Sequence, residues 1–410
     1  MNCRFCKTPV KTVFADLVNS PPSNSYLTKE QLNEPEAYYP LKVLVCDNCY
    51  LVQVDEYYKS EEIFSSDYAY FSSFSTSWLA HSKRYTEMMI NRFGFDQSSL
   101  VVELASNDGY LLQYFKEKNV PVLGIEPTAN TAAVAQEKGI ETVVEFFGVA
   151  MGEKLAAQGR QADLLLGNNV LAHVPDINDF VGGMKIALKS TGVITMEFPH
   201  LYQLVLNNQF DTIYHEHFSY LSFTTVKQIF EAHGLQLFDV QEIPTHGGSL
   251  RIFAKHAEDA SKEISKEVAR ILELEASAGM LTTDYYANFQ DRINKIKNDV
   301  LAFLIQSSES GKKVVGYGAA AKGNTLLNYC GVKGDDLLQF VVDANPHKQN
   351  KFLPGSHIPI VQEDRIKEEK PDYVIILPWN LKEEITSQLS YIRDWGGKFV
   401  VPVPQFEIID

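Results

Sequence analysis

The sequence predicts an α/β fold in which a small N-terminal cysteine module precedes two domains with parallel sheets. Two CxxC pairs lie near the N-terminus, residues 100–256 alternate short apolar runs with helical patterns, and a second strand–turn–helix pattern begins near Lys313. Strand–helix alternation is typical of parallel sheets that bind ligands at the carboxyl ends of their strands. We expect four segments, at 1–65, 66–256, 257–310 and 311–410.

The composition indicates a globular chain without a nucleic-acid or membrane partner. Of 410 residues, 45% are hydrophobic and 22% are charged, and the net charge is −15. An acidic chain without a basic block is poorly suited to bind nucleic acid or an anionic membrane. No run approaches the ~18 apolar residues of a membrane span, and the N-terminus lacks the apolar core of a secretory signal. We therefore expect a cytoplasmic protein, a monomer or weak homo-oligomer.

The two cysteine pairs predict a structural zinc site. Cys3 and Cys6 form one pair, and Cys46 and Cys49 form the other. In each pair one tight turn aims two thiolates at one ion, and two such turns complete a tetrahedral site with no open position for catalysis. The gap between the pairs exceeds the common spacing of about 15–20 residues, but the free energy of loop closure rises slowly with length. A redox pair, which would need a βαβ context, and four buried thiols are the alternatives.

The central segment carries the pattern of a nucleotide-type sheet with an unusual first loop. Its expected elements are strands at 100–104, 122–126, 163–167, 192–198, 236–242 and 250–255, and helices at 110–118 and 225–233. The first loop contains only Gly109, so the glycines that admit a pyrophosphate are missing. Asn107 and Asp108 suit a cofactor with an ammonium and no phosphate, such as S-adenosylmethionine. The final strand pair is typical of methyltransferase sheets using that cofactor.

Glu126 ends the second expected strand, 23 residues after Glu103. An acid about 20 residues on, at a strand end, commonly binds two ribose hydroxyls. The alternative is a solvated turn carboxylate. The position after a buried strand favours the role in cofactor binding.

Eight motifs together resemble one family. They are VELASNDGYLL at 102–112, GIEP at 124–127, EFFG at 145–148, NNVLAHVPD at 168–176, YHEHF at 214–218, THGGSLR at 245–251, GYGAAAKGNT at 316–325 and PWN at 378–380. The chain thus resembles the sugar-nucleotide C-methyltransferases, most closely those acting at C3 of dTDP-linked 4-keto deoxysugars. The resemblance covers nearly the whole chain. It implies an N-terminal zinc module, a central class I S-adenosylmethionine methyltransferase domain with a Rossmann-like fold, and a second, C-terminal Rossmann-like domain.

The resemblance also implies two groups of ligand contacts, with the nucleotide sugar bound between the last two domains. The expected cofactor contacts are Glu103, Ala105, Asn107, Asp108, Gly109, Tyr110, Leu111, Glu126, Pro127, Phe146, Phe147 and Asn168. The expected substrate contacts are Asn169, His173, His215, His246, Lys322 and Asn324.

The run from Tyr214 to His217 places a phenol, two imidazoles and a carboxylate in four consecutive positions. Removing a proton from a carbon beside a ketone needs a base of near-neutral pKa and a group that stabilises the oxyanion, and histidine has the unperturbed pKa nearest neutral. A metal-binding histidine pair and ordinary core or surface histidines are the alternatives.

The resemblance assigns roles to these groups. His217 matches the base that acts at C3, and Tyr214 and His173 match positions beside the C4 oxygen. Glu216 would orient a partner imidazole or the sugar. Tyr68, in an aromatic, hydroxyl-rich segment expected to cover the cofactor, would face the active site.

The C-terminal segment has a weaker signal. Its glycines are spaced GxGxxxxG rather than GxGxxG, although Lys322 and Gly323 could present a charge and a backbone N–H to a diphosphate at a helix start. The alternative is a degenerate Rossmann domain that only packs. For the whole chain, the alternatives to a methyltransferase are an NAD-dependent sugar-nucleotide oxidoreductase and a non-catalytic zinc-containing interaction protein.

Overall fold

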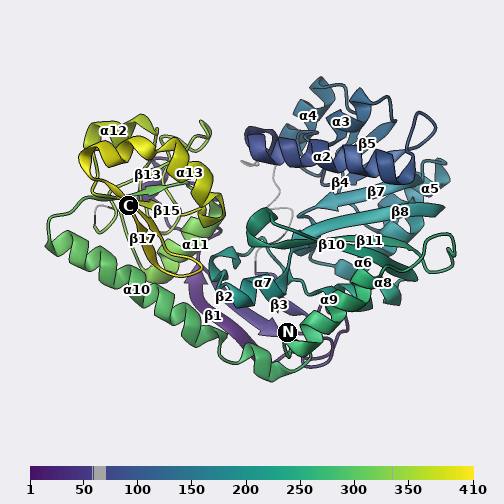
Figure 1. Cartoon of the computed structure of the whole chain (residues 1–410), viewed down its shortest axis with the longest axis horizontal. Helices are drawn as coiled ribbons and strands as arrows, with labels where there is room; N and C mark the ends of the chain where they lie inside the picture. Colours follow the sequence, from purple (N-terminus) through teal and green to yellow (C-terminus); the bar gives the residue numbers. More distant parts are fainter. Residues whose placement is uncertain (58, 60–70, 335) are drawn as a thin grey trace.

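The computed structural model describes residues 1–57, 59, 71–334 and 336–410, which form two lobes with an N-terminal set of strands between them (Figure 1). Over these residues the strands make a four-stranded, a seven-stranded and a six-stranded sheet. None of the described helices is both long enough and apolar enough to cross a membrane.

The N-terminal sheet has the order β1-β2-β3-β9 and is antiparallel. Its strands are β1 (Thr12–Ser20), β2 (Tyr39–Val45), β3 (Val52–Val54) and β9 (Ser219–Tyr220). The last strand comes from the central segment, with Val52 opposite Tyr220 and Gln53 opposite Ser219. The N-terminal module is therefore completed by residues that directly follow the YHEHF motif.

The seven-stranded sheet has the order β10-β11-β8-β7-β4-β5-β6. Its strands are β4 (Val101–Leu104), β5 (Val122–Ile125), β6 (Thr142–Val143), β7 (Ala162–Asn168), β8 (Leu188–Pro199), β10 (Leu235–Ile243) and β11 (Ser249–His256). β4 to β8 are mutually parallel, whereas β11 is antiparallel to both β8 and β10. The predicted parallel sheet with a terminal strand pair is confirmed.

Seven of the described α-helices belong to this part of the chain, and side chains cap the starts of three of them. They are α2 (Thr76–Phe93), α3 (Leu112–Glu117), α4 (Ala129–Glu137), α5 (Val149–Ala157), α6 (Ile177–Ala187), α7 (Leu201–Leu206) and α8 (Phe223–Ala232). The side chains of Ser75, Asp176 and Ser222 accept hydrogen bonds from backbone N–H groups in the first turns of α2, α6 and α8. Gly94 ends α2 in the left-handed conformation.

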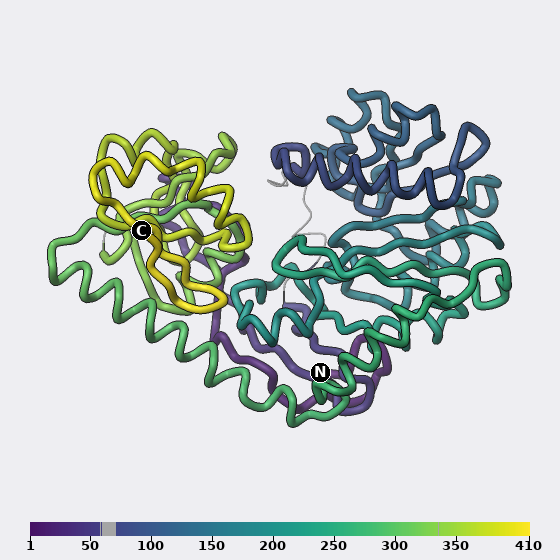
Figure 2. Tube along the Cα trace, viewed as in Figure 1, coloured from purple at the N-terminus to yellow at the C-terminus, as the bar shows by residue number. Residues whose placement is uncertain are grey.

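Two helices, α9 (Lys266–Ser277) and α10 (Phe289–Glu309), connect the lobes, and Figure 2 shows α10 running below the N-terminal strands to the C-terminal lobe. Glu275 ties α9 to the central domain. Its buried carboxylate accepts hydrogen bonds from the backbone N–H groups of Phe223 and Thr224 and contacts His200 Nε2 at 2.7 Å. These contacts satisfy donors at the start of α8.

The C-terminal sheet has the order β14-β13-β12-β15-β16-β17, and only its edge strand β17 is antiparallel to its neighbour. Its strands are β12 (Val314–Tyr317), β13 (Val341–Val342), β14 (Ile360–Val361), β15 (Tyr373–Ile376), β16 (Lys398–Val401) and β17 (Glu407–Ile409). Its helices are α11 (Ala321–Cys330), α12 (Asp364–Glu369) and α13 (Lys382–Gln388).

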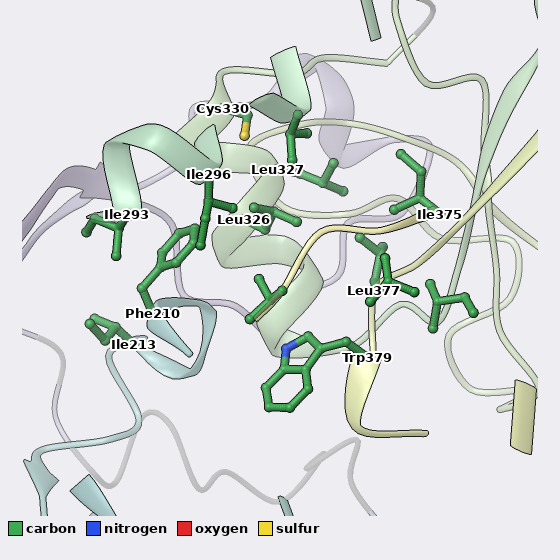
Figure 3. Close-up of a cluster of buried hydrophobic side chains, with 14 of the residues drawn as sticks. Phe210, Ile213, Ile293, Ile296, Leu326, Leu327, Cys330, Ile375, Leu377 and Trp379 are labelled. Carbon is green, nitrogen blue, oxygen red and sulfur yellow. The ribbon is translucent and has the colours of Figure 1, made fainter. Parts of the chain in front are cut away.

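The core of the C-terminal lobe includes side chains from the central segment. Phe210 and Ile213 lie with Ile293 and Ile296 of α10 and with Leu326 of α11 (Figure 3). Phe210 belongs to the short 3-10 helix η4 (Phe210–Thr212), just before the YHEHF motif. The exact segment boundaries stay predictions, because packing and strand pairing cross them.

Candidate active site

A cavity of about 400 Å³ lies at the carboxyl ends of β4, β5 and β7 and extends to α11. Fifteen predicted site residues line it: Ala105, Asn107, Tyr110, Glu126, Pro127, Phe146, Phe147, Asn168, Asn169, His173, Tyr214, Glu216, His217, His246 and Lys322. Six others do not: Glu103, Asp108, Gly109, Leu111, His215 and Asn324. Tyr68 lies outside the described residues.

The end of the cavity at which the cofactor is predicted, called the cofactor end, is shaped by the turn after β4. Ala105 and Asn107 have positive φ angles of 54° and 49°. The carboxylate of Glu126 holds this turn, because one oxygen accepts the backbone N–H of Asn107 at 2.8 Å. The other oxygen accepts the backbone N–H and hydroxyl of Thr128. A carboxylate has about four lone-pair sites, so Glu126 retains capacity for a ribose hydroxyl.

Two asparagines at the carboxyl end of β7, Asn168 and Asn169, indicate that a polar ligand belongs at this end. The carbonyl and amide atoms of the Asn168 side chain, and the carbonyl of Asn169, are buried without hydrogen-bond partners among the described residues. Buried polar groups in native proteins are normally paired. The residues present therefore fit S-adenosylmethionine, which carries donors and acceptors in its adenosine and amino-acid parts.

The predicted cofactor residues outside the lining support the loop from behind. Asp108 accepts the backbone N–H of Ser73 at 3.2 Å, which ties the segment before α2 to the loop. Gly109 has φ of 73°, and a Cβ there would lie 2.4 Å from Ile140. Glu103 is fully buried, and this burial raises the pKa of its carboxyl. None of these side chains lines the cavity, so the direct cofactor contact expected of them stays a prediction.

His217 is held in a defined tautomer at the other end of the cavity. Its Nδ1 lies 2.8 Å from the carbonyl oxygen of Thr212. A carbonyl only accepts, so Nδ1 carries the hydrogen and Nε2 is the basic nitrogen. Burial, with the neighbouring His173 and Lys322 adding to it, lowers the pKa of His217 well below 6.5. The imidazole is therefore neutral near pH 7.

The groups around His217 are also shifted by burial. The ring centroids of His173 and Tyr214 lie 4.7 Å and 4.0 Å from that of His217. Burial lowers the pKa of His173 and of His246 to about 4, and it raises the pKa of Glu216 to about 7. Such clustering of perturbed titratable groups in one cavity is a property of active sites.

Two predicted substrate contacts point elsewhere. The Nε2 atom of His215 lies 3.2 Å from the carbonyl oxygen of Pro40, and its ring packs edge-on against Tyr39. Asn324 is fully buried in α11, where its side-chain and backbone oxygens accept from the amide of Asn328. Neither lines the cavity, so direct contact of these two side chains with substrate stays a prediction that the geometry does not support.

Other lining residues were given no role by sequence reasoning, among them Asn24, Trp78 and Lys348, which carry polar or aromatic side chains. Asn24 comes from the N-terminal module and donates to Glu216 Oε1 at 2.6 Å. Lys348 donates to the carbonyl of Ala319 at 2.9 Å. No motif marks these three, because tertiary packing brings them to the cavity from distant segments.

The four cysteines of the N-terminal module converge. The sulfur atoms of Cys3, Cys6, Cys46 and Cys49 all lie within 4.8 Å of one another. The Cys3–Cys49 and Cys6–Cys46 sulfur separations are both 3.5 Å, far beyond the ~2.05 Å of a disulfide. This donor set fits a tetrahedral zinc ion, and Gln53 Nε2 donates to Cys3 Sγ at 3.2 Å as an outer-shell contact.

Comparison with known proteins agrees with this arrangement. Three family models match: a zinc binding domain at residues 3–64, a methyltransferase domain at 79–240 and a C-methyltransferase C-terminal domain at 244–404. The chain is 35% identical to C-methyltransferase NovU of Streptomyces niveus over 407 residues, which covers 99% of this chain and 96% of NovU.

Two solved structures are more distantly similar. One is a 1,6-didemethyltoxoflavin-N1-methyltransferase of Burkholderia thailandensis, with 15% identity, a TM-score of 0.37 and coverage of 51% of this chain and 95% of that one. The other is an S-adenosylmethionine-dependent methyltransferase of Anabaena variabilis, with 13% identity, a TM-score of 0.37 and coverage of 44% and 86%. On the full-length match to NovU and the three family models, the chain belongs to the C-methyltransferase family and is an S-adenosylmethionine-dependent enzyme with a zinc-binding domain.

Proposed function

We propose that the enzyme methylates C3 of a 4-keto-6-deoxysugar linked to a nucleotide, dTDP, and that the reaction passes through an enolate. The observation that carries this proposal is the neutral imidazole of His217, whose Nδ1–H is committed to the Thr212 carbonyl at 2.8 Å. Its Nε2 is then a base inside a cavity that also holds a phenol and a second neutral imidazole. Removing a proton from a carbon beside a ketone needs a base together with groups that stabilise the oxyanion.

The residues divide the work as follows. His217 Nε2 accepts the proton from C3, while the hydroxyl of Tyr214 and the imidazole of His173 stabilise the developing negative charge on the C4 oxygen. S-adenosylmethionine, when bound at the Asn168 end, supplies an electrophilic methyl group on a sulfonium. The cavity aligns the nucleophilic carbon with that end and keeps water from the reacting atoms. His217 releases its proton to solvent after methyl transfer.

The diphosphate of the substrate is proposed to lie against α11. Lys322 and Lys348 both line this part of the cavity, and they stand out in a chain whose net charge is −15. Lys322 Nζ lies 3.0 Å from Asn380 Oδ1 and 4.5 Å from the centre of the Trp379 ring. Two cations beside a helix N-terminus favour a phosphate-bearing ligand. Membership of a methyltransferase family gives no support to the oxidoreductase alternative.

Solvent exchange tests the proposal most directly. With a nucleotide 4-keto sugar and S-adenosylhomocysteine in deuterium oxide, the wild type incorporates deuterium at C3, and with S-adenosylmethionine the product gains one methyl group on carbon. His217→Asn abolishes both reactions and still binds S-adenosylhomocysteine. His215→Asn is the matched control, because that ring faces Pro40, and it retains both reactions. Methylation on oxygen, or exchange that persists in His217→Asn, contradicts the mechanism.

A further inference from the structure

Arg4 lies inside the first CxxC turn, between two cysteines of the metal cluster, and its side chain extends toward the active site. It is 8% exposed. Its Nη1 donates to the carbonyl of Pro175 at 2.6 Å, and its Nη2 donates to the carbonyl of Val54 at 2.5 Å. Its guanidinium also lies over the ring of Phe218, 5.3 Å from the ring centre. One side chain thus contacts three separate segments of the chain.

Two of those segments carry His173 and His217, two of the three described histidines that line the cavity. Pro175 is two residues after His173, and Phe218 directly follows His217. The two imidazole rings come from distant parts of the sequence, yet their centroids lie 4.7 Å apart. A planar guanidinium has donors in a fixed fork and a face that packs on an aromatic ring, so it fixes the positions of several groups at once.

Gln53 also connects the first CxxC turn to the segment that follows His217. The backbone N–H of Arg4 donates to Gln53 Oε1 at 2.9 Å, and Gln53 Nε2 donates to Cys3 Sγ at 3.2 Å. Gln53 lies on β3 opposite Ser219 of β9, and the backbone N–H of Val54 donates to the carbonyl of Phe218 at 3.1 Å. The cysteine turn is therefore joined to the segment after His217 by a side chain and by strand pairing.

We propose that Arg4 is a positioning residue that sets the separation and orientation of His173 and His217. The proposal rests on the proposed function, in which these two imidazoles act on one substrate. Arg4 does not touch the cavity, and it is not among the cavity-lining residues that the structure describes. It acts through Pro175 and Phe218, so the N-terminal module organises the active site as well as binding zinc.

The test compares Arg4→Gln and Arg4→Lys with Lys11→Gln in zinc-loaded, full-length enzyme. Lys11 is exposed in the same module, so its substitution changes net charge as Arg4→Gln does. Arg4→Lys keeps the charge but lacks the fork that reaches two carbonyls. Zinc content and the Kd for S-adenosylhomocysteine are measured first, and both are expected to match the wild type.

The deciding measurement is the ¹⁵N–¹H spectrum of the histidine side chains in the enzyme without substrate, assigned with His173→Asn and His217→Asn. Both Arg4 variants are expected to shift or broaden the signals of these two rings, and Lys11→Gln is expected to leave them unchanged. Turnover of both Arg4 variants is expected to fall about tenfold or more, since a small misplacement of catalytic groups has effects of this size.

The outcomes separate this proposal from the proposed function. Unchanged His173 and His217 signals in the Arg4 variants overturn the positioning role, whatever the substrate is. Loss of zinc or of folding in both variants also overturns it, because Arg4 would then serve only the integrity of the module. A wild type that methylates no nucleotide 4-keto sugar contradicts the proposed function, while the spectra still report on Arg4.

Discussion

The hydrogen bond between Trp379 and Asp211 joins the C-terminal lobe to the segment that holds the proposed base. Trp379 Nε1 donates to Asp211 Oδ2 at 2.6 Å. Asp211 is 1% exposed, and its Oδ1 has no hydrogen-bond partner among the described residues. Asp211 precedes Thr212, whose carbonyl holds His217, and Trp379 lies in the same buried cluster as Phe210 (Figure 3). Replacing Trp379 with Phe removes the donor and keeps an aromatic ring.

The expected loss of stability depends on pH because burial raises the pKa of Asp211 from 3.8 to about 6. A carboxyl whose pKa is higher in the folded state stabilises the fold below its unfolded pKa, and that contribution is lost as pH rises through about 6. Trp379 opposes this loss, because its N–H favours the charged form. A hydrogen bond to a charged group contributes about 1.5–3 kcal/mol, and one between neutral groups about 0.5–1.5 kcal/mol.

Trp379→Phe is therefore expected to lower the free energy of unfolding by about 1 kcal/mol at pH 5 and by about 2–3 kcal/mol at pH 8. Denaturant unfolding at both pH values measures the difference, followed by tryptophan-independent circular dichroism. The same substitution in an Asp211→Asn background is the control, because an amide does not titrate and the loss should be equal at both pH values. If Trp379→Phe lowers the free energy of unfolding equally at both pH values while Asp211 is kept, the reasoning is refuted.

Three further outcomes are expected. The pKa of His217 is well below 6.5, so its basic form persists as pH falls. We therefore expect kcat/KM to stay constant down to pH 6.5 and to decline only below it. A decline centred at pH 6.5 contradicts this. Asn24→Ala removes the donor that lowers the pKa of Glu216, so an infrared titration of the carboxyl band, with Glu216→Gln as reference, moves above about 7. Cys46→Ser, which leaves three of the four thiols, releases zinc and lowers the thermal midpoint, whereas Cys330→Ser leaves zinc content unchanged.

The sequence was most informative where spacing alone decides geometry. The CxxC pairs predict a tetrahedral cluster because each turn is local, and their four sulfurs do converge. The strand pattern predicts the parallel sheet and its terminal pair, because buried strands and their connections have a recognisable period. Helix starts have a local signal only where a side chain caps them, and none caps α11 at its start at Ala321.

The site was predicted least well where the backbone, rather than the residue type, decides direction. His215 and His217 are two residues apart, yet the ring of His215 contacts the carbonyl oxygen of Pro40 and the ring of His217 contacts that of Thr212. A turn separates them, so the motif shows which groups are present and not which way they face. Asn24 and Lys348 had no motif at all, because their place in the cavity follows from the packing of the N-terminal module and the C-terminal lobe.

The N-terminal module, the central sheet and the C-terminal lobe all contribute residues to the cavity, which explains why one chain carries all three. The central sheet supplies the cofactor end, but the opposite end is assembled from elsewhere: Asn24 contacts Glu216 from the N-terminal module, and Lys322 enters from the C-terminal lobe. The segment with His217 has little secondary structure of its own and is held between η4, which is packed into the C-terminal core, and β9, which is paired with β3. A methyltransferase sheet alone would therefore bind the cofactor but would not hold the proposed base in place.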